Sequence, residues 1–236
     1  MGAVTPSLSP EDDAAGLPAE VAAALRAGIG PERLTGYDLA SGGDQLRALH
    51  LYQWNTAVSG AVFEDLSTLE VVLRNACHHQ LQMWNATEGN QHPWYHHPVL
   101  APRHMQDVGA ARARVAQGKK TETEGRVVAE LMLGFWRLLH SKEYEVTLWR
   151  PCLRNAYPGA ATLSRTQVYD RLDHLNTLRN RVAHHEPVHG PTIGKVPKDL
   201  TGLHQELLEL LGWLDPHIRD WVATTSRVPR LLAAKP

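Results

Sequence analysis

The chain has 236 residues, a formal net charge of −1 and 43% hydrophobic residues, which is enough apolar material for a real core and excludes a disordered class of protein. No apolar run approaches the roughly 18 residues that a membrane span requires, and the first residues lack the basic-then-apolar pattern of a secretion signal. Two cysteines, Cys77 and Cys152, are too few for a disulfide framework, so we expect a cytoplasmic protein rather than a secreted or membrane one.

The first half of the chain is predicted to be mainly helical. Residues 1–17 combine Pro, Ser and acidic residues, which predicts a flexible acidic tail. A short Ala-rich helix is expected over 18–28, because a proline opens it and glycines follow it. Longer helices are predicted over 44–59 and 61–84, where apolar residues recur at intervals of three and four. A loop rich in Pro, Asn, Gly and His follows them.

The second half continues the helical pattern. Ser164 and Gln167 have the spacing of a capping box, and Pro187 removes a backbone donor and ends the helix that they start. Helices are predicted over 103–117, 124–140, 143–156, 164–186, 198–214 and after Pro216. Since no alternating strand pattern and no internal repeat competes, the sequence predicts an all-α bundle. We expect it to be a single domain over 18–225, with a basic tail over 226–236.

The tripeptide Leu-Arg-Asn occurs three times, at 73–75, 153–155 and 178–180. Two copies continue to a histidine at the same distance, so that Arg-Asn-x-x-x-His is written at 74–79 and again at 179–184. A shuffled chain of this composition would contain the pattern roughly 0.03 times. Two copies exceed what chance predicts, so the repetition indicates a chemical or a structural role for these residues.

The chemistry that fits these residue types is metal-independent RNA cleavage. A ribose 2′-OH attacks the neighbouring phosphate once its proton is removed, and His184 suits proton transfer near neutral pH. Arg179 offers a charged planar fork to the phosphorane, and Asn180 can orient either group without adding charge. The products are a 2′,3′-cyclic phosphate and a 5′-hydroxyl, and the reaction requires no metal.

Helix geometry restricts this interpretation. On an ideal helix Asn180 and His184 share a face, whereas Arg179 lies about 140° from His184 and close to the apolar stripe of the same helix. The three side chains converge more simply if a second copy of the helix faces the first. We therefore expect a homodimer with a shared cleft.

Both copies of the pattern also have a structural interpretation. An Arg-Asn pair near a helix end can satisfy backbone carbonyls, and His184 with His185 are cations that the helix dipole favours. In the first copy, Glu70 and Arg74 have the i,i+4 spacing of an ion pair. The sequence alone leaves the catalytic and structural alternatives open.

The remaining candidate sites are metal and RNA contacts. The many histidines have no recognised zinc spacing, so no metal or other cofactor is expected. Trp94, in the His-rich loop, is a candidate platform for stacking bases, although such aromatics usually anchor a core. Cations that are candidate RNA contacts, but are otherwise typical of a solvated surface, are Arg112, Arg114, Lys119, Lys120 and Arg126.

Several segments of the chain resemble the Abi-like (abortive-infection) proteins of bacteria, a family of the HEPN superfamily. The segments are LYQWN (51–55), LEVVLRNACHHQL (69–81), GFWRLL (134–139) with LW (148–149), and LRNRVAHHEPV (178–188). The last is the most specific, because the superfamily is marked by Arg, a polar residue and a His after four intervening residues. The resemblance implies an α-helical HEPN bundle, often dimeric, that acts as an RNase toxin in antiviral defence against phage.

The resemblance also assigns residues by position. Arg179, Asn180 and His184 match the catalytic motif. Glu70, Arg74 and Asn75 match a second polar cluster that is a candidate lining of the same cleft, and the neighbouring His79 and His185 are supporting candidates. The resemblance therefore implies an endoribonuclease with an RNA substrate, a second copy of the chain as partner, and an antitoxin or regulatory RNA that restrains it. The alternative is a non-catalytic RNA- or protein-binding module of the same fold.

Overall fold

A computed structural model describes residues 17–160 and 162–236 of the chain. All the secondary-structure elements named in these ranges are helices, and no strand is among them, which confirms the predicted all-α class. The chain divides into two compact units, one formed by the residues up to Ala57 with Ala234–Pro236 and the other by Val58–Ala233. The predicted acidic tail lies, except for Leu17, outside the described residues.

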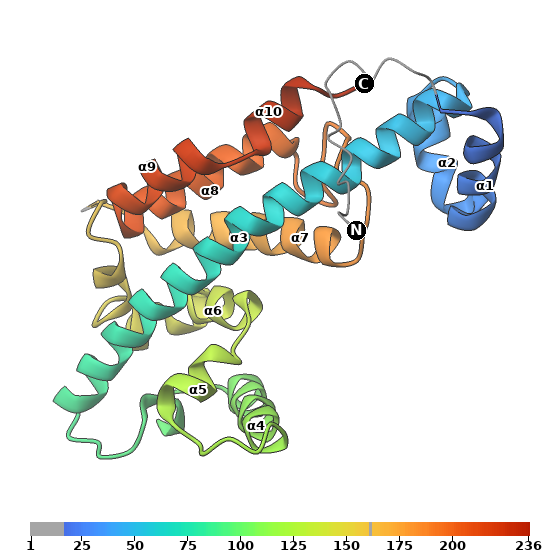
Figure 1. Cartoon of the computed structure of the whole chain (residues 1–236). Coiled ribbons are helices and arrows are strands. Elements are labelled where there is room, and N and C mark those ends of the chain that lie inside the picture. The colour runs from blue at the N-terminus through green and yellow to red at the C-terminus, as the bar shows by residue number, and fades with distance from the viewer. Residues whose placement is uncertain (1–16, 161) are drawn as a thin grey trace, which may run out of the picture. The chain divides into compact units, whose positions relative to one another are not determined.

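The first unit contains a helical hairpin that the sequence predicts only in part. Helix α1 (Ala19–Ile29) agrees with the predicted Ala-rich helix, whereas α2 (Pro31–Ala40) was not predicted (Figure 1). Gly30, with φ of 89°, separates them and adopts a backbone conformation that favours glycine. Both oxygens of Asp38 accept hydrogen bonds of 2.9 Å from Arg26, which lowers the pKa of that carboxyl.

Helix α3 (Gln45–Thr87) is one continuous helix of 43 residues, where the sequence predicts two helices separated at Ser59–Gly60. The separate helices were a wrong prediction. A glycine costs a helix only about 1 kcal/mol relative to alanine, and the buried face continues through it from Val58 to Ala61 and Leu66. Burial on both sides of Gly60 therefore outweighs its low helix propensity.

Three shorter helical regions follow. Helix α4 (Pro102–Gln117) agrees with the prediction. The helix predicted over 124–140 is divided into α5 (Glu124–Ala129) and α6 (Leu133–Leu139). Instead of the helix predicted over 143–156, the chain forms short 3₁₀ turns at Lys142–Tyr144 and Leu153–Ala156 and a π turn at Glu145–Trp149.

The last four helices are α7 (Arg165–Ala183), α8 (Leu200–Leu214), α9 (Pro216–Thr225) and α10 (Val228–Ala233). Helix α7 begins with the predicted capping box, in which Ser164 and Gln167 bond to each other's backbone amides. It packs between α6 and α8, and α8 packs in turn against α9 (Figure 1). None of the described helices combines the length and apolarity that crossing a membrane requires.

The segment 226–236, expected to be a basic tail, is bound to the rest of the chain at several points. It includes α10, whose Val228 is completely buried. Arg227 forms a bidentate ion pair with Glu64, and the ammonium group of Lys235 lies 5.5 Å from the centre of the Trp54 ring. These cations are engaged by the protein's own side chains.

Candidate active site at the end of helix α7

Helix α7 ends in a tight turn immediately before the segment that contains Pro187. The amide of His185 bonds to the carbonyl of Val182, and the amide of Glu186 bonds to the carbonyl of Arg181 at 2.8 Å. This pair of bonds is the Schellman motif, in which the residue that follows the C-cap adopts the left-handed backbone conformation. His185 occupies that position with φ of 56°, where glycine is the usual residue.

A groove of about 390 Å³ lies beside this helix end. One wall is the polar face of α7, and the other is the segment that leads to α8. The groove is lined by Asp173, His174, Thr177, Asn180, Arg181, His184, Glu186, Gly194, Lys195 and Val196. It therefore contains basic, acidic and neutral polar groups in one concave surface.

Of the three residues of the predicted catalytic motif, the structure brings two together. Asn180 and His184 are exposed and both line the groove, as their spacing of four on one helix face requires. Arg179 is half-buried and does not line it, because it lies beside Leu178 on the side of α7 that faces the core. Within one chain, Arg179 is not placed to contact a group bound in this groove.

Arg181 lines the groove but is occupied by the turn. Its guanidinium donates to the carbonyl of Pro187 through Nε and Nη2, at 3.2 and 3.1 Å, and pairs with Glu186 through Nη1 at 3.0 Å. These contacts hold the chain that leaves α7 against the helix. Arg181 therefore has a structural role that fixes the shape of the groove.

His174 lines the other end of the groove. Its Nδ1 lies 2.9 Å from a carboxylate oxygen of Glu206, a residue of α8 that is only 3% exposed. The second oxygen of Glu206 lies 2.9 Å from the ammonium group of Lys198. The two carboxylate oxygens of Glu206 are thus shared between the imidazole of His174 and the ammonium group of Lys198.

The sequence interpretation missed several lining residues, although part of the signal was present. His174, Thr177, Arg181 and His184 follow one another at intervals of three, four and three, which places them on a single helix face. This polar face is as periodic as the apolar one opposite. Lys195 lies outside the helix, and no spacing in the sequence indicates that it shares the groove.

The first copy of the pattern lies on α3 and makes structural contacts. Glu70 accepts a hydrogen bond of 2.9 Å from the amide of Leu133, so it caps the start of α6, and Arg74 donates to the carbonyl of Ala129 at the end of α5. The described ion pairs do not include one between Glu70 and Arg74, so their i,i+4 pairing was a wrong prediction. The two backbone groups that they contact lie on either side of the break between α5 and α6.

The other candidates on α3 do not line the α7 groove either. Asn75 and His79 are exposed on α3, and the preceding His78 accepts a hydrogen bond of 2.9 Å from the indole nitrogen of Trp94. Trp94 is only 1% exposed. Its ring is a core anchor, so the prediction of a base-stacking platform at this residue was wrong.

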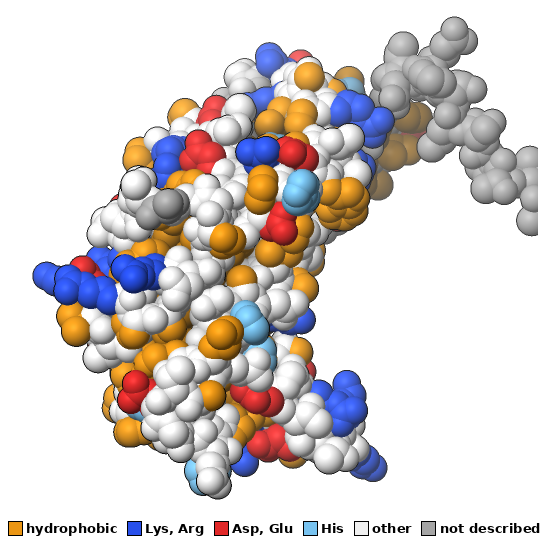
Figure 2. Space-filling view, turned by 90° about the vertical axis from the view of Figure 1, so that its left-hand side faces the viewer, with side chains coloured by type: hydrophobic (Ala, Val, Ile, Leu, Met, Phe, Trp, Pro, Cys, Tyr) orange, Lys and Arg blue, Asp and Glu red, His pale blue; other side chains and the backbone are white. Residues whose placement is uncertain are grey.

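The cations predicted to contact RNA are partly neutralised within the chain. Arg112 pairs with Glu122 and Arg114 with Glu130, each at 2.9 Å. Arg126 donates to the carbonyl of Thr121. Figure 2 shows one face of the molecule, on which Lys and Arg side chains form small separate groups interspersed with Asp and Glu. Lys119 and Lys120 are exposed and remain candidates.

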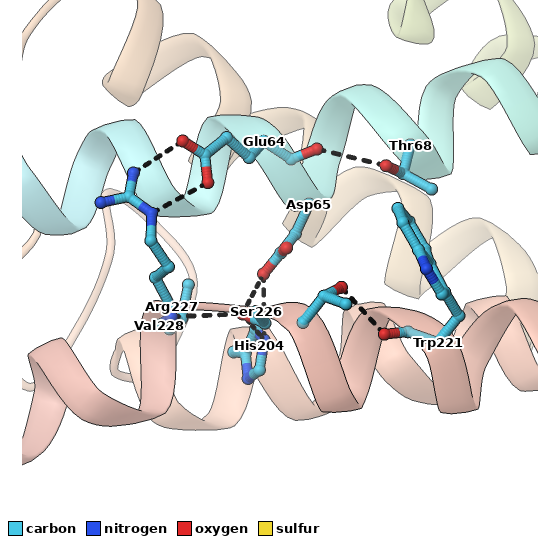
Figure 3. A network of polar contacts seen from close by, with 9 residues as sticks. Glu64, Asp65, Thr68, His204, Trp221, Ser226, Arg227 and Val228 are labelled. Atoms are coloured by element: carbon cyan, nitrogen blue, oxygen red, sulfur yellow. Dashed lines mark hydrogen bonds and ion pairs between the residues drawn. The ribbon is translucent and has the colours of Figure 1, made fainter.

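A buried Ser–His–Asp cluster joins α3 to the C-terminal helices (Figure 3). One oxygen of Asp65 lies 2.6 Å from the hydroxyl of Ser226 and 3.2 Å from Nε2 of His204. A catalytic triad needs the imidazole between the other two groups, with a different ring nitrogen toward each. Here the serine donates directly to the carboxylate and also accepts from the amide of Val228. The cluster therefore has a structural role, because it connects α3 and α8 to the start of α10.

Two other histidines are completely buried. His140 lies 2.8 Å from the carbonyl of Trp136 and 2.7 Å from the hydroxyl of Tyr157, and burial lowers its pKa to about 4. His104 bonds to Tyr144, and burial with the nearby Arg103 lowers its pKa to about 4 as well. Both histidines are therefore neutral core residues near pH 7.

The two cysteines are also core residues. Burial raises the pKa of the Cys77 and Cys152 thiols to about 12, which leaves them protonated and unreactive at neutral pH. Within residues 17–160 and 162–236, no three His, Cys, Asp or Glu side chains gather as metal ligands would. Comparisons with protein-family models, curated proteins and solved structures found no match for this chain.

Proposed function

We propose that the chain is a metal-independent endoribonuclease whose active site is the groove at the end of α7. The observation that supports this proposal is that Asn180 and His184 line one groove. An exposed imidazole is suited to proton transfer near neutral pH, and the neighbouring amide can orient a ribose or a phosphate without adding charge.

The proposed reaction is an internal transesterification. His184 takes the proton of a ribose 2′-OH, the O2′–P bond forms, and the P–O5′ bond breaks. The leaving oxygen takes a proton from water, and the products are a 2′,3′-cyclic phosphate and a 5′-hydroxyl. General acid–base catalysis of this kind contributes typically 10²- to 10⁴-fold to the rate.

The biological setting is proposed from the resemblance to Abi-like proteins of the HEPN superfamily. In that setting the chain is a cytoplasmic toxin of phage defence, acts as a homodimer and is restrained by an antitoxin or a regulatory RNA. A dimer would place a second α7 close to the first. The order of the motif, with Arg179 and Asn180 near the end of α7 and His184 at its C-cap, is the feature on which this part depends.

The test is cleavage of RNA by the purified chain with EDTA present, with end analysis of the fragments. We expect fragments that end in a cyclic phosphate, and a loss of at least 100-fold in rate for His184→Ala. His217→Ala is the matched control, because His217 is exposed on α9 and does not line the groove.

Undiminished cleavage by His184→Ala would contradict the assignment of the active site. RNA binding by the wild type without any cleavage would instead identify the non-catalytic binding module. Circular dichroism of each variant shows that the loss of activity is not a loss of folding.

A further inference from the structure

The proposed reaction builds negative charge on the non-bridging phosphate oxygens, and enzymes stabilise such charge with a positioned cation. The motif assigns this task to Arg179, but Arg179 is half-buried and lies off the groove. The groove therefore requires another cation if it binds a phosphate. This inference rests on the proposed function.

Two of the other basic side chains that line the groove are already paired with carboxylates. Arg181 pairs with Glu186 and also donates to a backbone carbonyl. His174 pairs with the buried Glu206. Using either of them for a phosphate would break a contact that maintains the wall of the groove.

Lys195 is different. It is exposed, it lines the groove, and in the described part of the chain no hydrogen bond or ion pair engages its ammonium group. A lysine ammonium is a compact charge with three donors. It is therefore available to a ligand without loss of an existing contact.

The backbone that presents Lys195 is anchored. Ile193 and Val196 exchange two backbone hydrogen bonds, of 3.1 and 3.0 Å, across a two-residue turn, and both side chains are buried. Gly194, between Ile193 and Lys195, has φ of 60°, and a Cβ built there would lie 3.1 Å from the methyl group of Thr177 on α7. The turn is thus pressed against the same helix that supplies Asn180 and His184.

We propose that Lys195 is the residue that contacts the phosphate of an RNA strand in this groove, in the role that the sequence motif assigns to Arg179. The ammonium group donates to non-bridging oxygens, binds the strand in the ground state and stabilises the phosphorane. The ligand class is a single-stranded RNA phosphodiester. Asn180 and His184 face the same bound group from the other wall.

The experiment compares Lys195→Gln, Lys195→Arg and Arg179→Gln with Lys142→Gln, an exposed lysine of the 3₁₀ turn at Lys142–Tyr144 that does not line the groove and serves as control. Binding is measured by fluorescence anisotropy with a 2′-O-methyl RNA that cannot be cleaved, over a range of salt concentrations. Single-turnover cleavage of the matching RNA is measured beside it.

We expect Lys195→Gln to slow cleavage about 100-fold, in the range found for removal of one oxyanion donor, and Lys195→Arg to restore most of the rate. We expect the salt slope of binding to fall by about 0.7, as the loss of one phosphate contact on single-stranded RNA predicts. Equal effects of Lys195→Gln and Lys142→Gln, or a loss of cleavage confined to Arg179→Gln, would overturn the proposal.

The two proposals fail in different ways. If His184→Ala is inactive and Lys195→Gln behaves like the wild type, the endoribonuclease stands and the role of Lys195 is refuted. If the wild type does not cleave RNA but Lys195→Gln alone weakens its binding, the phosphate contact stands and the enzyme is refuted.

Discussion

A buried histidine shows how a single residue links the stability of this protein to pH. The imidazole of His140 is enclosed between the carbonyl of Trp136 and the hydroxyl of Tyr157, both about one hydrogen-bond length away. Protonation would place a charge in the core and oppose both burial and the proton that Tyr157 donates. The pKa is therefore lowered to about 4 in the folded chain, against 6.5 for an unperturbed histidine.

From this shift we predict that acid destabilises the protein well before its carboxyl groups titrate. Between pH 6.5 and about 4 the unfolded chain binds a proton at His140 and the folded chain does not, so the free energy of unfolding falls as the pH falls. The loss is about 1.4 kcal/mol for each pH unit, or roughly 2 kcal/mol at pH 5. Above pH 6.5 both states are neutral at this group and the contribution is constant.

The measurement is urea unfolding at pH 7.5 and pH 5 for the wild type and for His140→Gln, whose side chain does not titrate. We expect the variant to lose about 2 kcal/mol less than the wild type between these two pH values. His217→Gln, at an exposed position on α9, serves as the control. A variant whose stability depends on pH as steeply as that of the wild type would exclude His140 as the cause.

At the scale of elements, the continuity of α3 is the clearest difference between the sequence interpretation and the structure. Ser59 and Gly60 are weak helix formers, and propensity alone favours a break there. Burial of the face from Val58 to Leu66 requires the same helix axis on both sides of the glycine. Gly60 is exposed, and nothing lies within 4 Å of the position that its Cβ would occupy.

We therefore predict that Gly60→Ala stabilises the protein by about 1 kcal/mol, since the helix gains propensity and no neighbour is displaced. Thermal unfolding is expected to shift upward by roughly 2–4 °C for a chain of this size. Gly42→Ala is the matched control, because Gly42 also has open space around it but has φ of 64°, and we expect it to destabilise. A Gly60→Ala protein that is less stable than the wild type would show that α3 does not continue through this position.

At the scale of the whole molecule, the sequence predicted the features that depend on residues three or four positions apart. The capping box at Ser164 and the shared face of Asn180 and His184 depend on spacings of three and four residues, and both are present in the structure. Two other features depend on tertiary packing. These are the hydrogen bond that the amide of Leu133 donates to Glu70, 63 residues away, and the position of Lys195 beside α7. No pattern along the chain encodes those contacts, so the break before α6 and half of the groove were not predictable.

The cluster at Asp65 is another contact between residues that are far apart in the sequence. Asp65 on α3 meets His204 on α8 and Ser226 before α10, 139 and 161 residues away in sequence. Its side chain is only 8% exposed. Removal of the carboxylate takes away the acceptor of the Ser226 hydroxyl and leaves Ser226 and His204 with only the 3.3 Å contact between them.

We predict that Asp65→Ala lowers the free energy of unfolding by about 2 kcal/mol, within the range for hydrogen bonds to a charged group. Glu64→Ala is the control one residue earlier, because Glu64 pairs with Arg227 at the exposed surface and such pairs contribute little. Urea unfolding compares the two variants, and amide exchange of α10 reports where the structure opens. If Asp65→Ala and Glu64→Ala have equally small effects, the C-terminal helices are held by apolar packing alone, and the buried polar cluster is not what fixes them to α3.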